Sequence, residues 1–297
     1  MEYIQMAENV TYSRIVLGFW RLLEWNLSLT ELSKFIDEVL ELGITTFDHA
    51  DIYGDGNAER VFGDVLKKHP GLRKKTQLIT KNAIVYKSET ARVKYYDNSE
   101  KHIIGQVEKS LAGFGTDYID TLLFHRPNPF MDPADVAGAL EKLQRDGKVL
   151  SFGVCNYKPD DFRMLKSYLT VPLITDQVEL SPLNMENLEN GVINLCLEER
   201  IHPMIWSPLA GGRIFTSDEP EAKRLRDTLE VIRGEISAGS IDEVAFAWLL
   251  SHPVKMIPLT GSGEIGLVKK PVQALKYQLT PEQWFMIWTA VKGHKVP

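Results

Sequence analysis

Four polar residues in the first half of the sequence are of types that can move a proton to or from a substrate. A tyrosine hydroxyl has a pKa of about 10, so it is a poor acid at neutral pH unless its surroundings stabilise the phenolate. A nearby lysine ammonium does so, and an aspartate compensates the buried lysine charge. A histidine can orient a carbonyl group and donate a hydrogen bond to its oxygen. The set that could deliver a proton to a carbonyl oxygen in this way is Asp48, Tyr53, Lys81 and His125.

Each of these residues, taken alone, has an ordinary explanation. An aspartate after a strand usually caps a helix or a turn, a loop tyrosine usually packs, and a lysine after a strand is usually solvated. A histidine after an apolar strand is as often a core residue as a site residue. Their common position supports the hypothesis: Asp48, Lys81 and His125 each follow a predicted strand, and Tyr53 lies in the loop after the first of them. In a parallel barrel these positions share one rim.

The elements that would position them alternate regularly along the chain. Short β-branched and apolar runs, with a hairpin-like segment before the first, predict strands at 13–17, 44–47, 78–80, 119–124, 149–154, 173–175, 203–206 and 255–257. Helical periodicity predicts helices at 29–42, 58–67, 99–112, 133–145, 160–168, 186–200, 221–235, 241–251 and 281–291. This alternation predicts an α/β fold, a (β/α)8 TIM barrel in a single domain over residues 1–297. A doubly wound sheet is the alternative, but it does not need eight such units.

Composition narrows the class of protein. The formal net charge of −6 argues against a nucleic-acid partner, because binding phosphates requires a basic surface. The two cysteines, Cys155 and Cys196, have neither metal-ligand spacing nor a disulfide framework. There is no apolar run of about 20 residues that could span a membrane, and the N-terminal residues lack the pattern of a signal peptide. We therefore expect a cytoplasmic protein with no membrane partner.

Two stretches of sequence resemble a known family. Residues 43–54, followed by 57–59, resemble the first signature of the aldo-keto reductases, and residues 107–125 resemble the second. Lys81 matches the family's catalytic lysine. The resemblance runs from about residue 12 to the end, and residues 125–132 and the C-terminal segment are similar to a bacterial oxidoreductase branch of the family. It implies that the four residues named above form a catalytic tetrad with Tyr53 as general acid. The implied activity is NAD(P)H-dependent reduction of aldehydes or ketones.

The same resemblance assigns a cofactor pocket to the second half of the chain. Asn156 and Gln177 would hold the nicotinamide carboxamide, Cys155 would replace the family's usual serine, and an aromatic ring would stack on the nicotinamide. Without the resemblance, Cys155 would be interpreted as a small buried residue and the aromatic residue as core. The residues implied to bind the cofactor are Cys155, Asn156, Gln177, Trp206, Ser207, Leu209, Gly211, Gly261, Ser262 and Glu264.

One departure from the family pattern affects the choice of cofactor. Many relatives carry a lysine about where Glu264 falls and an arginine about where Leu267 falls, and those cations bind the 2′-phosphate of NADPH. A carboxylate would repel that phosphate and could accept hydrogen bonds from the free ribose of NADH. The remaining cations, Lys269 and Lys270, are also consistent with a solvated helix face. The family expectation is NADPH, with NADH as a serious alternative.

The substrate partner is predicted to be a small carbonyl compound, and a monomer is expected rather than an oligomer. Four aromatic residues in loops could line an apolar pocket, or each could pack against its own loop; they are Trp20, Trp25, Tyr86 and Phe130.

Two other functions are consistent with parts of the sequence. One is a nicotinamide-binding redox sensor or regulatory subunit with little turnover, which would share the fold and the tetrad. The other is a metal-assisted hydrolase using His49, Asp51 and His125. That hypothesis is disfavoured because Lys81 would lie among the supposed ligands, so we predict no metal site.

Overall fold

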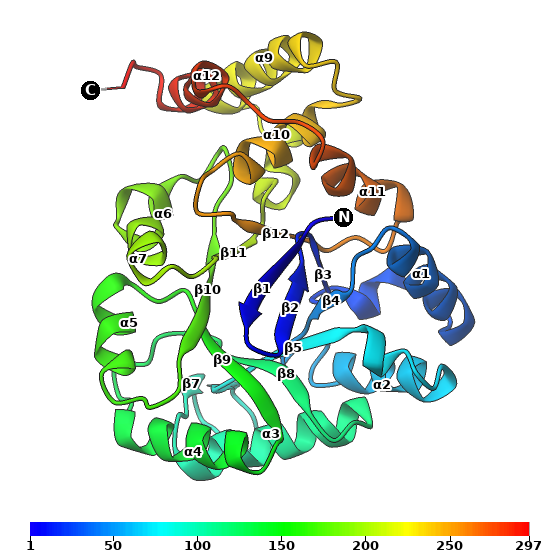
Figure 1. Ribbon diagram of the computed structural model, residues 1–297, viewed down its shortest axis with the longest axis vertical. Coiled ribbons are helices and arrows are strands. Elements are labelled where there is room, and N and C mark those ends of the chain that lie inside the picture. The colour runs from blue at the N-terminus through cyan, green and yellow to red at the C-terminus, as the bar shows by residue number, and fades with distance from the viewer. Residues whose placement is uncertain (297) are drawn as a thin grey trace.

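The computed structural model describes residues 1–296, which form a closed barrel of eight parallel strands with helices around it (Figure 1). The predicted (β/α)8 barrel is therefore confirmed. In their order around the barrel the strands are β3 (Val16–Gly18), β4 (Thr46–Asp48), β5 (Gln77–Asn82), β8 (Ile119–Phe124), β9 (Val149–Cys155), β10 (Leu173–Glu179), β11 (Met204–Trp206) and β12 (Ile257–Thr260), and β12 pairs with β3.

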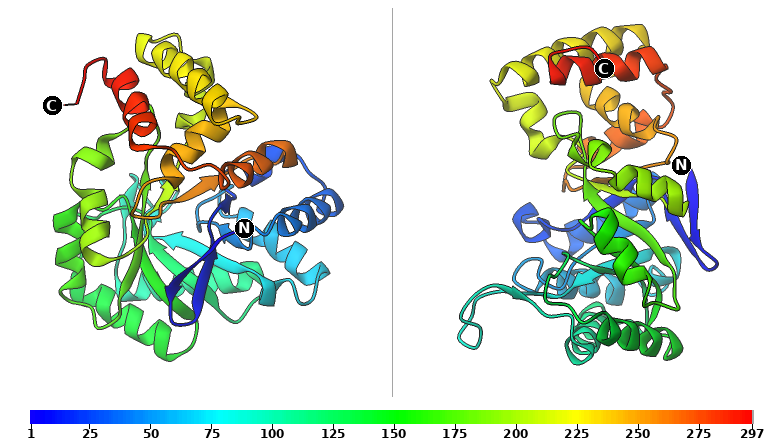
Figure 2. Two further views of the ribbon diagram at one scale, coloured as in Figure 1. Left: turned by 45° about the horizontal axis from the view of Figure 1, so that its top comes forward. Right: turned by 90° about the vertical axis from the view of Figure 1, so that its left-hand side faces the viewer.

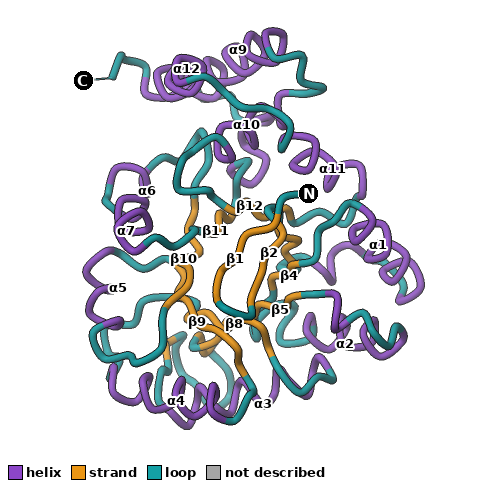
Figure 3. Tube along the Cα trace, viewed as in Figure 1, coloured by secondary structure: helices purple, strands orange, loops and turns teal. Residues whose placement is uncertain are grey.

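The helices cover the outside of the barrel (Figure 3). They are α1 (Leu29–Glu41), α2 (Ala58–Lys68), α3 (Glu100–Phe114), α4 (Pro133–Arg145), α5 (Pro159–Lys166), α6 (Glu186–Glu189), α7 (Val192–Glu199), α8 (Arg213–Thr216), α9 (Pro220–Glu235), α10 (Ile241–Leu250), α11 (Ile265–Ala274) and α12 (Pro281–Lys292). Helices α9 and α12 pack on each other beyond α10, outside the ring (Figure 1). Within residues 1–296, no helix is both long and apolar enough to cross a membrane.

Two strands extend further than the sequence predicted. Strand β10 continues past 175 to Glu179, because the polar residues Asp176 and Gln177 are buried in the barrel wall. The last strand does not end before Pro258 but includes it. The N–H of Ile257 donates to Pro203 O (2.9 Å), so the ladder with β11 needs no donor from the proline.

Two further differences concern helices. The helix predicted over 186–200 is divided into α6 and α7 at Gly191, whose φ of 89° is in the left-handed region and cannot continue a helix. Helix α11 was absent from the predicted set, because Gly266 and Pro271 interrupt its helical pattern.

A hairpin closes the N-terminal end of the barrel. It consists of β1 (Tyr3–Ala7) and β2 (Val10–Ser13) and lies across the barrel opening in Figure 1. Tyr12 is fully buried, and its hydroxyl is hydrogen-bonded to Thr121 of β8. The backbone N–H groups of Thr45 and Thr46 donate to Ser13 Oγ (3.1 and 3.2 Å). Because this end is closed, a ligand can reach the barrel only from the opposite end.

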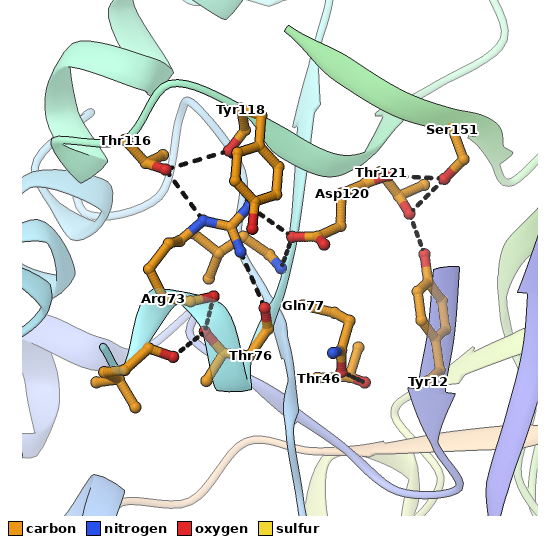
Figure 4. A network of polar contacts seen from close by, with 12 residues as sticks. Tyr12, Thr46, Arg73, Thr76, Gln77, Thr116, Tyr118, Asp120, Thr121 and Ser151 are labelled. Atoms are coloured by element: carbon orange, nitrogen blue, oxygen red, sulfur yellow. Dashed lines mark hydrogen bonds and ion pairs between the residues drawn. The ribbon is translucent and has the colours of Figure 1, made fainter. Parts of the chain in front are cut away.

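A polar network at the closed end fixes two strands that carry site residues (Figure 4). Arg73 pairs with Asp120 of β8 (2.8 Å) and donates to Thr116 Oγ1 (3.0 Å) and to Tyr118 O (2.9 Å). The other partner of Asp120 Oδ2 is the N–H of Leu78 in β5 (2.8 Å). The network therefore sets β5 and β8 relative to each other at the end remote from the site.

Candidate active site

The four predicted catalytic residues lie together at the C-terminal end of the barrel. Strands β4, β5 and β8 are neighbours, so the residues at their ends share one rim. Asp48 is the last residue of β4, Lys81 is the fifth of six residues in β5, and His125 follows β8 directly. Tyr53 lies in the β4–α2 loop, where its N–H donates to Ala50 O (3.0 Å). That turn brings the phenol back over the end of the barrel.

Lys81 is the centre of the group. Its side chain is fully buried, and its Nζ donates to Asp48 Oδ2 (2.7 Å), to His49 O (2.8 Å) and to Tyr53 Oη (3.1 Å). These bonds use all three donors of the ammonium group. The lysine is therefore held in one position, with its charge next to the tyrosine oxygen.

Gln177 of β10 extends this chain of contacts across the barrel. Its Nε2 donates to Asp48 Oδ1 (2.8 Å), and the Cys155 thiol lies 3.9 Å from its Oε1. The resemblance implied for Gln177 only a contact with the cofactor carboxamide, and nothing in the sequence links residues 48 and 177. Gln177 connects the predicted catalytic residues to the predicted cofactor residues.

The electrostatic environment keeps Tyr53 protonated and Lys81 charged. Burial alone would lower the pKa of Lys81, but Asp48 and the neighbouring groups outweigh it, so the pKa is raised. Burial raises the pKa of Tyr53 to about 12, although Lys81 lowers it. The expected net lowering of the tyrosine pKa is not found, because desolvation of the phenolate is the larger effect. The hydroxyl is thus a proton donor at neutral pH, and the lysine is placed to stabilise the phenolate left behind.

His125 is neutral at neutral pH. Burial, followed by the charge of Lys81, holds its pKa well below the usual value for histidine. Its ring meets the Tyr53 ring edge to face, with the centroids 5.9 Å apart. Its Nδ1 is buried without a hydrogen-bond partner in the described part of the chain. A neutral imidazole beside the phenol can donate one hydrogen bond to a substrate oxygen.

A cleft of about 240 Å³ leads to Tyr53 from solvent. It is lined by Trp20, Arg21, Leu23, Glu24, Ile52, Tyr53, Gly54, Asp55 and Tyr86. Trp20 and Tyr86 therefore lie where the sequence predicted an aromatic wall.

The other two aromatic residues of that prediction lie elsewhere. Trp25 is wedged between Phe19 and Phe35, with ring centroids 5.5 Å from each, and packs under Gly263. Phe130 is 94% exposed outside the cleft. Of the two alternatives that the sequence left open, the pocket wall does not apply to these two residues, since a loop position alone does not fix which way a side chain points.

The residues predicted for the nicotinamide follow three adjacent strands, β9, β10 and β11. Asn156 comes directly after β9 with a φ of 63°, and its Nδ2 donates to Cys155 Sγ (2.9 Å). The indole N–H of Trp206, at the end of β11, donates to Asn156 Oδ1 (3.0 Å). Burial raises the pKa of Cys155, so the thiol stays neutral. The half-buried indole is fixed at its edge, which suits it to stack on a flat ring.

The residues predicted for the phosphates lie in the two following loops. Gly211 and Gly212 have left-handed φ values of 65° and 91°, and a Cβ on either would meet nothing within 4 Å. Their backbone therefore faces open space, as a loop that receives a phosphate requires. Ser207 and Leu209 precede them, while Gly261, Ser262 and Glu264 form the loop before α11. A flat indole, exposed backbone and a helix N-terminus along one arc fit a dinucleotide.

Two residues of the metal-hydrolase alternative have other surroundings. His49 is fully buried and stacks on Phe19 with ring centroids 4.3 Å apart, and neither ring nitrogen has a hydrogen-bond partner among residues 1–296. Asp51 is turned toward α3, where it accepts a hydrogen bond from Gln106 (2.9 Å). Over residues 1–296 no group of three histidine, cysteine or acidic side chains is arranged to hold a metal ion.

Comparisons with known proteins agree with this geometry. A family described as "Aldo/keto reductase family" matches residues 14–291. The oxidoreductase YcsN of Bacillus subtilis, described as uncharacterized, is 48% identical over the full length of both chains. The oxidoreductase YdhF of Escherichia coli is 43% identical over 96% of each chain. A 6-dehydroglucose reductase of Agrobacterium fabrum is 37% identical over the full length of both.

Proposed function

Because the chain belongs to the aldo/keto reductase family, we propose that it reduces aldehydes or ketones to alcohols with a nicotinamide cofactor and with Tyr53 as general acid. One observation carries the proposal: Tyr53 lines the cleft, and its hydroxyl accepts a hydrogen bond from a fully buried Lys81. The relatedness to a protein named 6-dehydroglucose reductase supports a carbonyl substrate.

When bound, the nicotinamide cofactor supplies a hydride to the carbonyl carbon. Tyr53 donates its proton to the carbonyl oxygen, and the ammonium of Lys81 stabilises the phenolate that remains. Asp48 balances the buried lysine charge, and Gln177 holds the second oxygen of that carboxylate. His125, neutral in this site, donates a hydrogen bond to the same carbonyl oxygen and orients it toward Tyr53.

The ten predicted cofactor residues fit one extended dinucleotide along the arc from β9 to α11. Asn156 would hold the carboxamide beside Cys155 and Gln177, and the Trp206 indole would stack on the nicotinamide. The open backbone around Gly211 would receive the pyrophosphate.

We further propose that NADH binds at least as well as NADPH, although NADPH is the family expectation. Glu264 is exposed at the N-terminal end of α11, and Leu267 is an exposed apolar residue one turn later. Lys270 is not free for a phosphate, because it donates to Ser240 Oγ (2.9 Å) and lies 3.6 Å from the buried carboxylate of Glu243. Lys269 is the remaining exposed cation of α11.

The test is the loss of nicotinamide absorbance with a reactive aromatic aldehyde, run in parallel with NADH and NADPH. We expect turnover with at least one cofactor and a loss of about 10²–10⁴-fold in kcat for Tyr53→Phe, which removes the acid but keeps the ring. Cofactor binding is measured separately by fluorescence titration. Tight binding without turnover would favour a redox sensor or regulatory subunit, and no binding of either cofactor would refute the proposal.

A further inference from the structure

Two cations flank the candidate catalytic histidine at the open end of the barrel. Arg126 follows His125 directly, is half-buried, and has its guanidinium carbon 6.0 Å from the centroid of the Trp206 ring. Lys94 belongs to the long β5–α3 loop, where it lies between two short antiparallel strands, β6 (Ile84–Val85) and β7 (Tyr95–Tyr96). Its Nζ lies 5.5 Å from the centroid of Tyr86, a residue that lines the cleft. This loop projects from the barrel on the side opposite to the β1–β2 hairpin (Figure 2, right).

Neither cation is neutralised by the protein. Among residues 1–296, no carboxylate lies within 4.0 Å of Arg126 or Lys94, although fourteen other pairs of this kind are formed. Both charges lower the pKa of His125, after burial and Lys81, and no acidic group opposes them there. Lys81 itself is already balanced by Asp48.

The acidic residues that line the cleft come from other loops. Glu24 and Asp55 belong to the segments after β3 and β4, and Arg21 lies in the first of these. Arg126 and Lys94 come instead from the loops after β8 and β5. In a chain of net charge −6, two cations that have no ion-pair partner within residues 1–296 and whose charges both reach His125 are a local reversal of the overall charge.

We propose that Arg126 and Lys94 bind an anionic group on the substrate, so that the preferred substrates are aldehydes or ketones carrying a carboxylate. The planar guanidinium of Arg126 matches a carboxylate with two parallel hydrogen bonds, and Lys94 adds a mobile point charge from the overhanging loop. Each cation lies near an aromatic ring, and within residues 1–296 neither side chain donates a hydrogen bond to the protein, so N–H groups remain for the anion. This inference rests on the proposed function and narrows its substrate class.

The experiment compares 4-carboxybenzaldehyde with its methyl ester, which differ in charge; the ester is the more electron-withdrawing group, so intrinsic activation of the aldehyde favours the ester and cannot produce a preference for the acid. We expect wild-type kcat/KM to be about 10-fold higher for the acid, as a charge-assisted hydrogen bond allows. Arg126→Gln should remove about 10-fold from kcat/KM for the acid and leave the ester within about threefold. Lys94→Gln should also lower kcat/KM for the acid and not for the ester, by a smaller factor than Arg126→Gln.

Lys34→Gln is the matched control, because it removes one exposed positive charge from α1, away from the barrel rim. It should leave the ratio of acid to ester unchanged. A wild-type ratio at or below one, or an equal effect of Arg126→Gln on both substrates, would overturn the inference while leaving the reductase function intact.

A second readout does not depend on turnover. Benzoate is titrated into the free protein and followed by tryptophan fluorescence, to which Trp20 and Trp206 at the rim contribute. We expect Arg126→Gln to weaken benzoate binding at least fivefold and Lys34→Gln to leave it unchanged. If neither aldehyde is reduced, the proposed function fails, and this titration alone decides whether the anion site exists; unchanged binding in Arg126→Gln would overturn it.

Discussion

At the scale of single residues, Lys81 has a structural role as well as a chemical one. Its three bonds hold Asp48, the backbone at His49 and the Tyr53 hydroxyl in one arrangement. Replacing it with methionine would leave the Asp48 carboxylate buried and facing an apolar chain. We predict that Lys81→Met lowers the free energy of unfolding by about 3–5 kcal/mol, the usual result of breaking a buried ion pair. Urea unfolding followed by tryptophan fluorescence measures the loss.

The double variant Asp48→Asn/Lys81→Met separates stability from chemistry. An uncharged amide no longer requires a counter-ion, so at least half of the lost stability should return, while turnover stays as low as in Lys81→Met. If the double variant is instead less stable than Lys81→Met, the ion pair is not what stabilises this part of the site.

The residues of the tetrad could be predicted because their types and their positions after strands are local properties of the sequence. The hydrogen bond from Gln177 to Asp48 could not, because it joins residues 129 positions apart on opposite sides of the barrel. The side-chain directions of Trp25 and Phe130 were likewise beyond local pattern, since they depend on what the loops pack against.

At the scale of elements, prediction succeeded where local signals agreed and failed where burial overrode them. Helix α1 starts at a capping box of Ser28 and Glu31, so both its type and its start were readable from sequence. The extension of β10 was not readable, because Asp176 and Gln177 are polar yet buried. In α11, Pro271 is tolerated within a helix whose buried side faces the barrel.

The contact between α2 and α3 depends on one glycine. A Cβ on Gly63 of α2 would lie 2.1 Å from Gly113 O of α3, which is backbone and cannot move aside cheaply. Alanine normally stabilises a helix interior relative to glycine by about 1 kcal/mol. We predict that Gly63→Ala instead lowers the free energy of unfolding by at least about 2 kcal/mol, because the helices must separate.

Gly105→Ala is the control for that substitution. Gly105 lies inside α3, and its Cβ would meet nothing within 4 Å, so this variant should gain about 0.5–1 kcal/mol. Chemical unfolding of both variants tests the pair. Equal effects of the same sign would show that helix propensity, and not the close approach, controls both positions.

The start of α11 is the element at which cofactor preference should be adjustable. Glu264→Lys replaces a carboxylate with a cation beside the position proposed for the adenosine end of the cofactor. We predict that it lowers the Kd of NADPH relative to that of NADH by about 10-fold, the effect of one charge-assisted contact. Glu264→Gln, which removes the repulsion without adding a cation, should give a smaller shift of the same sign. If the ratio of the NADPH Kd to the NADH Kd is unchanged in both variants, the adenosine ribose of the cofactor does not lie beside residue 264.

At the scale of the whole molecule, buried histidines and buried aspartates have opposite effects on how stability changes with pH. Burial holds the pKa values of His49 and His125 well below the usual value, so the native state resists charging them. Stability from these residues is present above about pH 6.5 and is lost as the pH falls below it. Burial raises the pKa of Asp51 to about 7 and that of Asp176 to about 8. Stability from these acids is lost as the pH rises toward those values, so we expect maximal stability slightly below neutral pH.

Asp176 makes this balance testable, because it is fully buried in β10 and its Oδ2 has no hydrogen-bond partner in the described chain. The native state binds its proton up to about pH 8, whereas the unfolded chain releases it near pH 4. The free energy of unfolding should therefore fall with pH over this range, by at most about 1.4 kcal/mol per pH unit from this group. Asp176→Asn cannot ionise, so its stability relative to wild type should increase steadily from pH 5 to pH 8 in urea unfolding.

Asp227→Asn, on the exposed face of α9, is the control. Its free energy of unfolding should differ from that of wild type by the same amount at every pH. A constant difference for Asp176→Asn as well would mean that the carboxylate is already ionised in the native state, and that the decline in stability above neutral pH has to come from Asp51 and the other buried acids.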